Sequence, residues 1–218
     1  TMVIQTPDKK GWFWYIPLHD DRVSVGVVRP FDLLFKGQRS HEETYLAEVE
    51  RCAAVKKRVA SAKRVTGWFA TKDYSYRSRQ LAGEGWVLVG DAHGFLDPLY
   101  SSGVMLALRS GEMAADAIVA GLKKNDVSAA QLGNWGPIYN RGVDRMRRLV
   151  CEYYDGFSFG KFVKRFPELS GTVTDLLIGD LFTERVDRVW GPMESMYPAG
   201  KHVPVKWNEG QPPSEEVK

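Results

Sequence analysis

The sequence predicts an α+β protein in which a mixed sheet is combined with several helices. Two runs rich in β-forming residues, 11–18 and 23–29, are separated by four polar residues, which indicates a hairpin. A short apolar run at 86–89 precedes a helix of small residues that begins at Gly103. Apolar residues then recur at steps of three or four between 132 and 157, which is typical of helices with one buried face.

Residues 1–80 are expected to form an antiparallel sheet and one helix. Ser40 is a suitable N-cap, and acidic residues follow it in the first turn, so a helix is predicted over 41–55. Residues 64–79 return to the alternation of apolar and polar side chains that is typical of strands.

Residues 81–125 predict a strand, a tight turn and a helix. The apolar run suits a strand covered on both faces, and Gly90 after it lets the backbone approach a ligand closely. Small residues recur at every fourth position of the helix that begins at Gly103. Gly111 among them is expected to allow close packing on the sheet, and the helix is predicted to end near Asn125.

The carboxy-terminal part of the chain is predicted to be helical over residues 126–198. Its apolar stripe lies opposite Arg141, Arg145 and Arg148, which we interpret as a solvated face. Residues 199–218 carry several prolines and charges, and we expect a poorly ordered tail or one that wraps on a surface.

The composition indicates a globular protein and argues against several classes. The 218 residues are 44% hydrophobic, which is enough for a sizeable core. The net charge of +3 is too small to indicate nucleic-acid binding, so the basic residues 56–58 are interpreted as another solvated helix face. No apolar run approaches the roughly 20 residues of a membrane span. No secretory signal is visible, although a missing amino-terminal segment would hide one, and we expect a cytoplasmic protein.

The turn after the apolar run carries the candidate ligand-binding residues. Gly90 and Asp91 follow the predicted strand, where a carboxylate can accept hydrogen bonds from ligand hydroxyls. The helix after Ser102 begins at Gly103 and offers free N–H groups and the positive end of its dipole. The alternatives are a strand-end cap or ion pair for Asp91 and simple helix capping for Ser102. His93 either touches a cofactor or is hydrogen-bonded to backbone.

These residues lie within a stretch, 85–103, that resembles the second flavin motif of FAD-dependent aromatic monooxygenases and flavin-dependent halogenases. Residues 12–17, Trp-Phe-Trp-Tyr-Ile-Pro, fit the halogenase signature Trp-x-Trp-x-Ile-Pro in full. Residues 97–103, Asp-Pro-Leu-Tyr-Ser-Ser-Gly, resemble a loop of halogenases that act on phenols or pyrroles. Tryptophan halogenases have a glutamate where this chain has Tyr100, which argues against free tryptophan as the substrate.

The resemblance implies a flavin site and a halide site. In that family the aspartate, here Asp91, holds the ribityl chain of FAD, and the helix amino end faces the isoalloxazine. Five residues would bind the cofactor: Gly90, Asp91, Pro98, Gly103 and Val104. The backbone N–H groups of Ser102 and Gly103 would hold the halide, because a helix amino end offers weak donors and positive potential.

Trp12 and Trp14 lie two residues apart on a predicted strand and therefore share one face. Two aromatic side chains on one sheet face are more often core than catalytic. The family resemblance implies instead a steric role, in which the pair keeps the substrate away from the flavin. Halide, and not the substrate, then reacts with the flavin. Phe13 and Tyr15, on the other face, are expected to pack in the core.

The resemblance also implies elements that this sequence does not contain. No strand–Gly-x-Gly-x-x-Gly–helix element, which holds the ADP half of FAD in this family, occurs in this sequence. No lysine here matches the family's catalytic lysine. We therefore expect the fold of FAD aromatic hydroxylases without its amino-terminal Rossmann-like half. Residues 1–80 would be its substrate-side sheet and 81–125 its strand–Gly-Asp–helix element, and we expect the fragment alone to be inactive.

The predicted activity of the intact enzyme is halogen transfer. Reduced FAD from a separate flavin reductase, with oxygen, would drive the transfer of chloride or bromide to an electron-rich aromatic, free or bound to a carrier protein. One alternative is a FAD-dependent aromatic monooxygenase or a geranylgeranyl-reductase-like oxidoreductase, against which the tryptophan pair argues. The other is a non-catalytic module that binds a substrate or a carrier protein.

Overall fold

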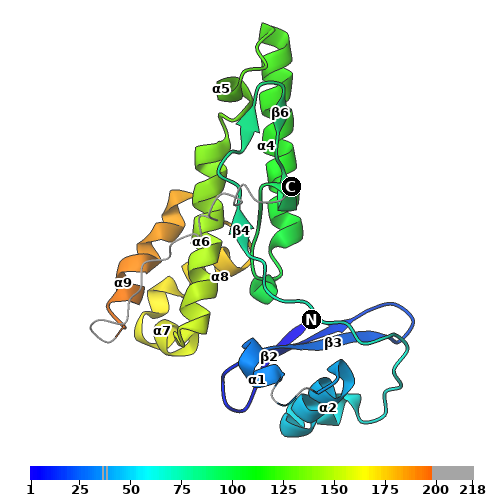
Figure 1. Cartoon of the computed structure of the whole chain (residues 1–218). Helices are drawn as coiled ribbons and strands as arrows, with labels where there is room; N and C mark the ends of the chain where they lie inside the picture. The colour runs from blue at the N-terminus through cyan, green and yellow to red at the C-terminus, as the bar shows by residue number, and fades with distance from the viewer. Residues whose placement is uncertain (36, 38, 198–218) are drawn as a thin grey trace. The chain divides into compact units, whose positions relative to one another are not determined.

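The computed structural model describes residues 1–35, 37 and 39–197, and the chain divides into two compact units (Figure 1). The first unit is Thr1–Asp73 and the second is Tyr74–Lys218. The predicted tail, 199–218, lies outside the described residues. Helix and strand are both present in quantity, as the α+β prediction requires.

The first unit contains a three-stranded antiparallel sheet in the order β1-β2-β3, formed by Met2–Gln5, Trp12–Pro17 and Val23–Val28. The predicted hairpin is confirmed, because β2 pairs with β3 and the N–H of Leu18 donates to the carbonyl of Arg22 at 2.9 Å.

Three helices follow the sheet: α1 (Phe31–Leu34), α2 (His41–Arg51) and α3 (Ala53–Val59). Ser40 is the N-cap of α2, as predicted, and it forms a capping box with Glu43. The single helix expected over 41–55 is wrong, because Cys52 is extended (φ −107°, ψ 90°) and separates α2 from α3. The break places Cys52 and Val55 in the core.

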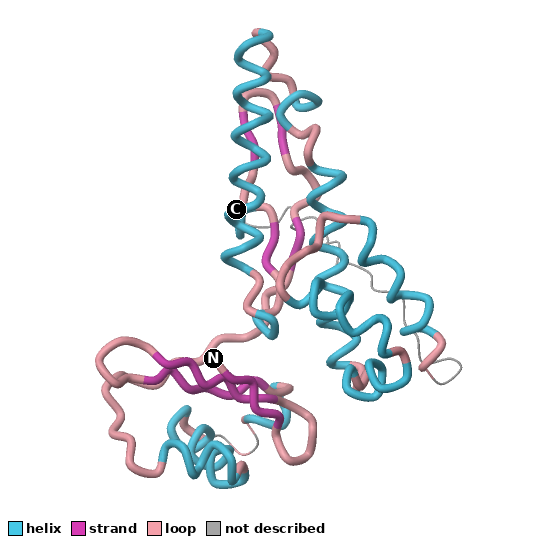
Figure 2. Tube along the Cα trace, turned by 180° about the vertical axis from the view of Figure 1, so that it is seen from behind, coloured by secondary structure: helices cyan, strands magenta, loops and turns pink. Residues whose placement is uncertain are grey.

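The core of the first unit lies between the sheet and these helices. Phe13 is fully buried and packs with Val49, Cys52 and Val55, which confirms its predicted packing role. Figure 2 shows the three strands as one layer with the helices on one side of it. One face of β2 is therefore structural.

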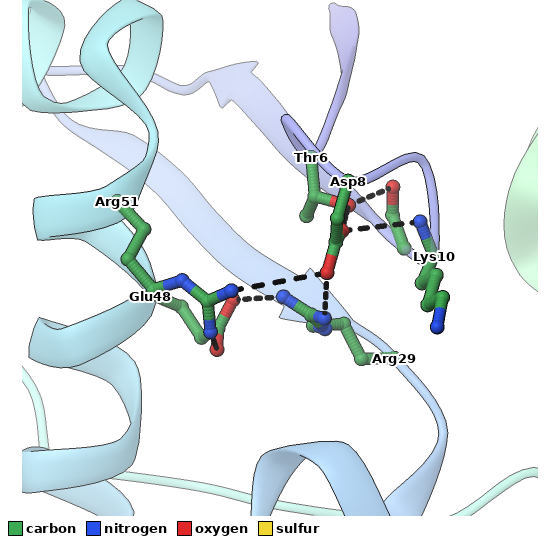
Figure 3. Close-up of polar contacts among 7 residues, drawn as sticks. Thr6, Asp8, Lys10, Arg29, Glu48 and Arg51 are labelled. Carbon is green, nitrogen blue, oxygen red and sulfur yellow. Dashed lines mark hydrogen bonds and ion pairs between the residues drawn. The ribbon is translucent and has the colours of Figure 1, made fainter.

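A buried charge network ties the sheet to α2 (Figure 3). The guanidinium of Arg29, whose side chain is 3% exposed, donates to Glu48 Oε2 at 2.6 Å and to Asp8 Oδ2 at 2.5 Å. The Thr6 hydroxyl and the Lys10 N–H donate to the other oxygen of Asp8, at 2.8 and 3.2 Å. Burial opposes ionisation of Asp8, but these hydrogen bonds and the charge of Arg29 lower its pKa to about 2.

The strand-like reading of 64–79 is wrong for most of that segment. Only β4 (Tyr76–Arg77) is a strand, and the side chains of Val65 and Phe69 are 70% and 86% exposed. Alternation of apolar residues predicts a strand only where a neighbouring strand pairs with it and one face is covered. Neither condition holds between residues 60 and 75.

The second unit is mainly helical. It contains α4 (Gly103–Lys124), α5 (Ala129–Leu132), α6 (Gly136–Tyr154), α7 (Phe159–Arg165), α8 (Ser170–Leu177) and α9 (Trp190–Glu194), with 3₁₀ turns at Gly90–Ala92, Pro98–Tyr100, Pro167–Leu169 and Glu184–Val189. The α4 helix ends as predicted, with Asn125 in the left-handed region at φ 53°. The apolar stripe of α5 and α6 is buried, which confirms the helical prediction there.

The basic face predicted for α6 is only partly solvated. Arg145 is 5% exposed, and its guanidinium donates to Asp187 at 2.7 and 2.5 Å and to the carbonyl of Leu181 at 2.6 Å. Arg141 is exposed, as expected. The 3₁₀ turn that carries Asp187 covers this side of α6, so Arg145 holds two segments together.

The strands of the second unit are short and antiparallel. β4 pairs with β7 (Gly94–Phe95), and β5 (Ala82–Gly83) pairs with β6 (Trp86–Val87). All strand pairs among the described residues are antiparallel, in three separate sheets, so the expected mixed sheet is not found there. The covered strand predicted at 86–89 is wrong as well: it is two residues long, and Trp86 is 42% exposed. A strand is covered on both faces only where other strands flank it, and here a tight hairpin supplies one partner.

Candidate active site

The turn at Gly90 is fixed against α4. Gly90 has φ +53°, and its N–H donates to the buried hydroxyl of Ser110 at 2.8 Å. A Cβ at position 90 would lie 3.1 Å from the Cβ of Ala107, so glycine is needed for both the backbone conformation and the close approach. The expectation for Gly111 is wrong, because a Cβ there would meet nothing within 4 Å. Ala107 and Ser110 make the close contact instead.

Asp91 is exposed and follows directly after this fixed glycine. Its backbone carbonyl accepts a hydrogen bond from the hydroxyl of Tyr76. Among residues 1–35, 37 and 39–197, no side chain or N–H group is seen to bond to the Asp91 carboxylate, which leaves it available to a ligand. Neither alternative role, a strand-end cap or an ion pair, is seen for Asp91 among these residues.

The loop from Asp97 to the start of α4 is shaped by its own side chains. One carboxylate oxygen of Asp97 accepts from the Leu99 N–H at 2.9 Å, and the other accepts from the Tyr154 hydroxyl at 3.0 Å. Pro98 begins the 3₁₀ turn and is exposed. Tyr100 is half-buried, and burial, together with the nearby Tyr153, raises its pKa. Tyr100 is therefore a neutral phenol at physiological pH.

The amino end of α4 carries no side-chain cap from its N-cap residue. Ser102 has helical backbone angles and is 6% exposed, but its hydroxyl makes no capping hydrogen bond. The first helical bond runs from the N–H of Leu106 to the carbonyl of Ser102 at 2.9 Å. The N–H groups before Leu106 have no partner within the helix, as at any helix start. Gly103 and Val104 are exposed, and nothing lies within 4 Å of a Cβ at Gly103.

His93 is buried close to the turn and is hydrogen-bonded to α6. It is 3% exposed, and its Nε2 lies 2.8 Å from the side-chain oxygen of Asn140 on α6, while Nδ1 has no hydrogen-bond partner among the described residues. Burial lowers the pKa of His93, and so does the charge of Arg77, against the effect of the Asn140 hydrogen bond. His93 is therefore neutral, and its ring is bonded to a side chain of α6 instead of to backbone. No sequence pattern pointed to Asn140, which is 47 positions away.

Trp12 and Trp14 lie on β2 in the first unit. Their ring centroids are 6.3 Å apart at an interplanar angle of 61°, so the two residues share a face as predicted. Trp12 is 2% exposed, and the indole N–H of Trp14 donates to Ser24 at 3.1 Å. The Trp14 ring covers Gly26 on β3, where a Cβ would lie 2.0 Å from the ring. Gly26 is thus a supporting residue that the sequence patterns did not identify.

The candidate residues are divided between the two units. Gly90, Asp91, Pro98, Ser102, Gly103 and Val104 belong to Tyr74–Lys218, and there the structure brings the Gly90 turn against the second turn of α4. The tryptophan pair belongs to Thr1–Asp73. No group of three potential metal ligands occurs in the described part of the chain. No helix among those residues is both long and apolar enough to cross a membrane.

Comparison with known proteins gives a consistent result. The family model described as tryptophan halogenase matches residues 3–158. A pyrrole-2-carbonyl-[peptidyl-carrier protein] chlorinase of Pseudomonas fluorescens is 28% identical over 91% of this chain and 44% of its own length. A tryptophan 2-halogenase of Chondromyces crocatus is 43% identical over 66% of this chain and 28% of its own.

A solved structure agrees with these sequence matches. The flavin-dependent brominase Bmp2 superposes with a TM-score of 0.74 at 29% identity, over 85% of this chain and 48% of the brominase chain. The chain therefore spans less than half the length of these relatives. Because the family model matches well over half of the residues, the chain belongs to the flavin-dependent halogenase family.

Proposed function

We propose that these residues form the carboxy-terminal part of an enzyme that uses reduced FAD and oxygen to transfer chloride or bromide to an electron-rich aromatic. Family membership supports the class of enzyme. The observation that carries the proposal is the Asp91 carboxylate, which is exposed and has no partner among residues 1–35, 37 and 39–197, beside a turn fixed to α4. A residue held in place with its functional group unused is suited to bind a ligand.

The residues present fit one part of FAD, the flavin and its ribityl chain. Asp91 would accept hydrogen bonds from ribityl hydroxyls, and the φ of +53° at Gly90 holds the backbone close to α4 so that the carboxylate faces outward. Pro98 and Val104 are exposed and would pack on the ring system. When bound, the reduced flavin with oxygen supplies the oxidising power that turns halide into an electrophilic halogen.

The amino end of α4 would hold the halide. The N–H groups of Ser102 and Gly103 stand at the positive end of a helix of 22 residues, and the hydroxyl of Ser102 does not cap the helix. The position before Ser101 is held by Tyr100, which is neutral at physiological pH because burial raises its pKa. Position 100 therefore carries no negative charge that would repel the halide.

Trp12 and Trp14 would exclude the aromatic substrate from the flavin. The two rings contact each other, and the Ser24 hydroxyl accepts a hydrogen bond from the Trp14 indole. Gly26 has no side chain, which lets the Trp14 ring pack directly on β3. A rigid aromatic pair provides a barrier that a flexible side chain would not. Halide, which is smaller, would pass where the substrate could not.

The substrate is proposed to be a phenol or a pyrrole, and to arrive on a carrier protein. Tyr100 in place of the glutamate of tryptophan halogenases supports this class. Two relatives, the Pseudomonas fluorescens chlorinase and a Pseudoalteromonas luteoviolacea brominase, are named for pyrrole substrates carried by a peptidyl-carrier protein. A separate flavin reductase would supply the reduced cofactor.

The test is product analysis with and without halide. The whole protein that contains these residues receives reduced FAD, oxygen and a panel of phenols, pyrroles and tryptophan, both free and as carrier-bound thioesters. We expect halide-dependent halogenated products, detected by mass spectrometry. A hydroxylated product formed without halide would instead assign the protein to the aromatic monooxygenases. If neither product forms with any free or carrier-bound substrate, the non-catalytic binding module is the correct reading.

A further inference from the structure

A basic segment in the first unit is not used by the proposed chemistry. Residues 51–72 contain seven basic residues and no acidic one: Arg51, Lys56, Lys57, Arg58, Lys63, Arg64 and Lys72. The chain has 30 basic and 27 acidic residues, so the remainder has 23 basic against 27 acidic and is net negative. The positive charge of this protein is therefore concentrated in one segment.

The fold turns these charges outward. Val55 is fully buried in α3 and Val59 is half-buried, so they anchor the helix to the core. Lys56, Lys57 and Arg58 occupy the exposed side of the same helix. Cations in the last turn of a helix offset its dipole, which is reason enough for one or two of them. Lys63 and Arg64 lie beyond the helix, so the helix dipole does not account for them.

The segment after α3 is held to the unit by aromatic contacts. Arg64 lies over the ring of Trp68, with 5.0 Å between the guanidinium carbon and the ring centroid, and Trp68 packs on Tyr45 of α2 at 5.1 Å. Val65 and Phe69 on this segment are exposed, at 70% and 86%. Arg51 pairs with Glu48 and Lys56 with Glu50, but no acidic residue within 51–72 offsets the other cations. Exposed apolar side chains in a segment with excess positive charge are typical of a surface that binds an acidic partner.

We infer that this surface, residues 51–72, docks the acidic carrier domain that delivers the aromatic substrate. This inference rests on the proposed function, because it identifies the site on this chain that would receive a carrier-bound substrate. A carrier domain presents acidic side chains and the phosphodiester of its phosphopantetheine arm at one surface, which complements the basic surface in sign. Val65 and Phe69 would supply the apolar contact area that charge pairs alone lack. The surface lies in the same unit as Trp12 and Trp14.

The test measures binding in the absence of flavin, oxygen and halide. The full 218-residue chain is titrated with a phosphopantetheinylated peptidyl carrier domain that bears a pyrrole-2-carbonyl thioester. We expect the double variant Lys57→Glu/Lys63→Glu to weaken binding by about tenfold or more and to lose most of the dependence on salt concentration. The matched control is Lys161→Glu/Lys164→Glu, which makes the same change of charge at exposed positions of α7. It should change binding by less than about twofold.

Each outcome decides the inference. Equal losses of carrier affinity in the two double variants would mean that only net charge matters. No loss of affinity in either would place the carrier elsewhere. Both results overturn the inference. A DNA duplex of matched charge serves as a competitor, and a duplex that binds as tightly as the carrier would assign the surface to nucleic acid. If the carrier binds as predicted but no halogenation is found, the proposed function fails while the docking surface stands. In an active protein, the Lys57→Glu/Lys63→Glu variant should raise KM for the carrier-bound substrate and leave turnover of a free aromatic unchanged.

Discussion

Asp8 and Asp91 are both aspartates in tight turns, yet their surroundings are opposite. Asp8 accepts hydrogen bonds from Thr6, Lys10 and Arg29, and these lower its pKa to about 2 against the effect of burial. The Asp91 carboxylate is exposed, and no bond to it is seen within the described part of the chain. The first carboxylate is committed to the fold, and the second makes no such contact among the described residues.

The difference shows how a structure separates a structural acid from a candidate ligand-binding one. Around Asp8 the side chains converge on the carboxylate, and around Asp91 they converge on the backbone. Ser110 fixes the N–H of Gly90, and Tyr76 donates to the carbonyl of Asp91. A backbone fixed in this way orients a carboxylate without using its hydrogen-bonding capacity. Substitutions should therefore affect stability at one site and ligand binding at the other.

The largest effect is expected when the positive charge of Arg29, which pairs with both Asp8 and Glu48, is removed. Arg29→Met keeps most of the side-chain volume but leaves Glu48, which is 7% exposed, without its main partner. Breaking one side of a buried ion pair costs about 3–5 kcal/mol, because the remaining charge is left desolvated. Urea denaturation followed by circular dichroism would measure the loss.

The control for Arg29 is Arg22→Met. A guanidinium nitrogen of Arg22 lies 3.7 Å from Oδ2 of Asp20, and the two side chains are 60% and 80% exposed. An exposed pair of this kind contributes about 0–1 kcal/mol. Similar losses in Arg29→Met and Arg22→Met would show that the network of Figure 3 is not a buried one in solution.

At the other site, Asp91→Ala should affect binding and leave stability unchanged. Loss of a charge-assisted hydrogen bond to the ribityl chain should weaken FAD binding to the whole protein by about 1.5–3 kcal/mol, roughly tenfold to a hundredfold. The free energy of unfolding should change by less than about 0.5 kcal/mol. Flavin fluorescence titration measures the binding, and Asp116→Ala, at an exposed position of α4, is the control for charge alone. Unchanged flavin affinity together with lost folding would make Asp91 a structural residue like Asp8.

Two glycines sharpen the comparison, because only one of them supports the Asp91 turn. Gly90→Ala places a Cβ at φ +53° and 3.1 Å from Ala107, and the left-handed conformation alone should cost about 1–2 kcal/mol. Gly111→Ala meets nothing within 4 Å inside a helix and should stabilise the protein by about 0.5–1 kcal/mol. Opposite shifts in the midpoint of thermal unfolding are expected. Shifts of the same sign would mean that the turn does not pack on α4 as described.

Local sequence signals predicted some of these elements well. The β2–β3 hairpin, the N-cap at Ser40 and the end of α4 at Asn125 each depend on residues within a few positions, and the structure confirms all three. The predictions of strands at 86–89 and 64–79 were wrong over most of their length, because a strand also depends on partners that local alternation does not reveal.

The supporting contacts of the candidate site were harder to predict. Gly111 belongs to the predicted pattern of small residues and Ser110 does not, yet the packing shows that Ser110 is the residue that contacts the turn. Arg29 with Glu48 and His93 with Asn140 join residues 19 and 47 positions apart, which no motif connects. The sequence identified Asp91 as a candidate because its motif is local. It did not identify what holds Asp91 in place.

The smallest effect concerns the pH dependence of the Asp8 network. Its folded-state pKa of about 2 lies below the ordinary aspartate value of 3.8, so ionised Asp8 stabilises the folded state above pH 4. That stabilisation should fall as the pH drops from about 4 to about 2 and the carboxylate takes up a proton. Since the Asp8 side chain is 32% exposed, solvent screens the interaction, and we expect a contribution of about 1 kcal/mol or less.

Asp8→Asn isolates this contribution from the general response of the protein to acid. The variant should be less stable than the wild type at neutral pH, and the two stability curves should converge between about pH 4 and pH 2. Asp20→Asn, at a position that is 80% exposed, is the control and should run parallel to the wild type throughout. Curves that stay parallel for Asp8→Asn as well would show that Asp8 does not titrate with folding. The contrast with Asp91 would then rest on burial and hydrogen bonding alone.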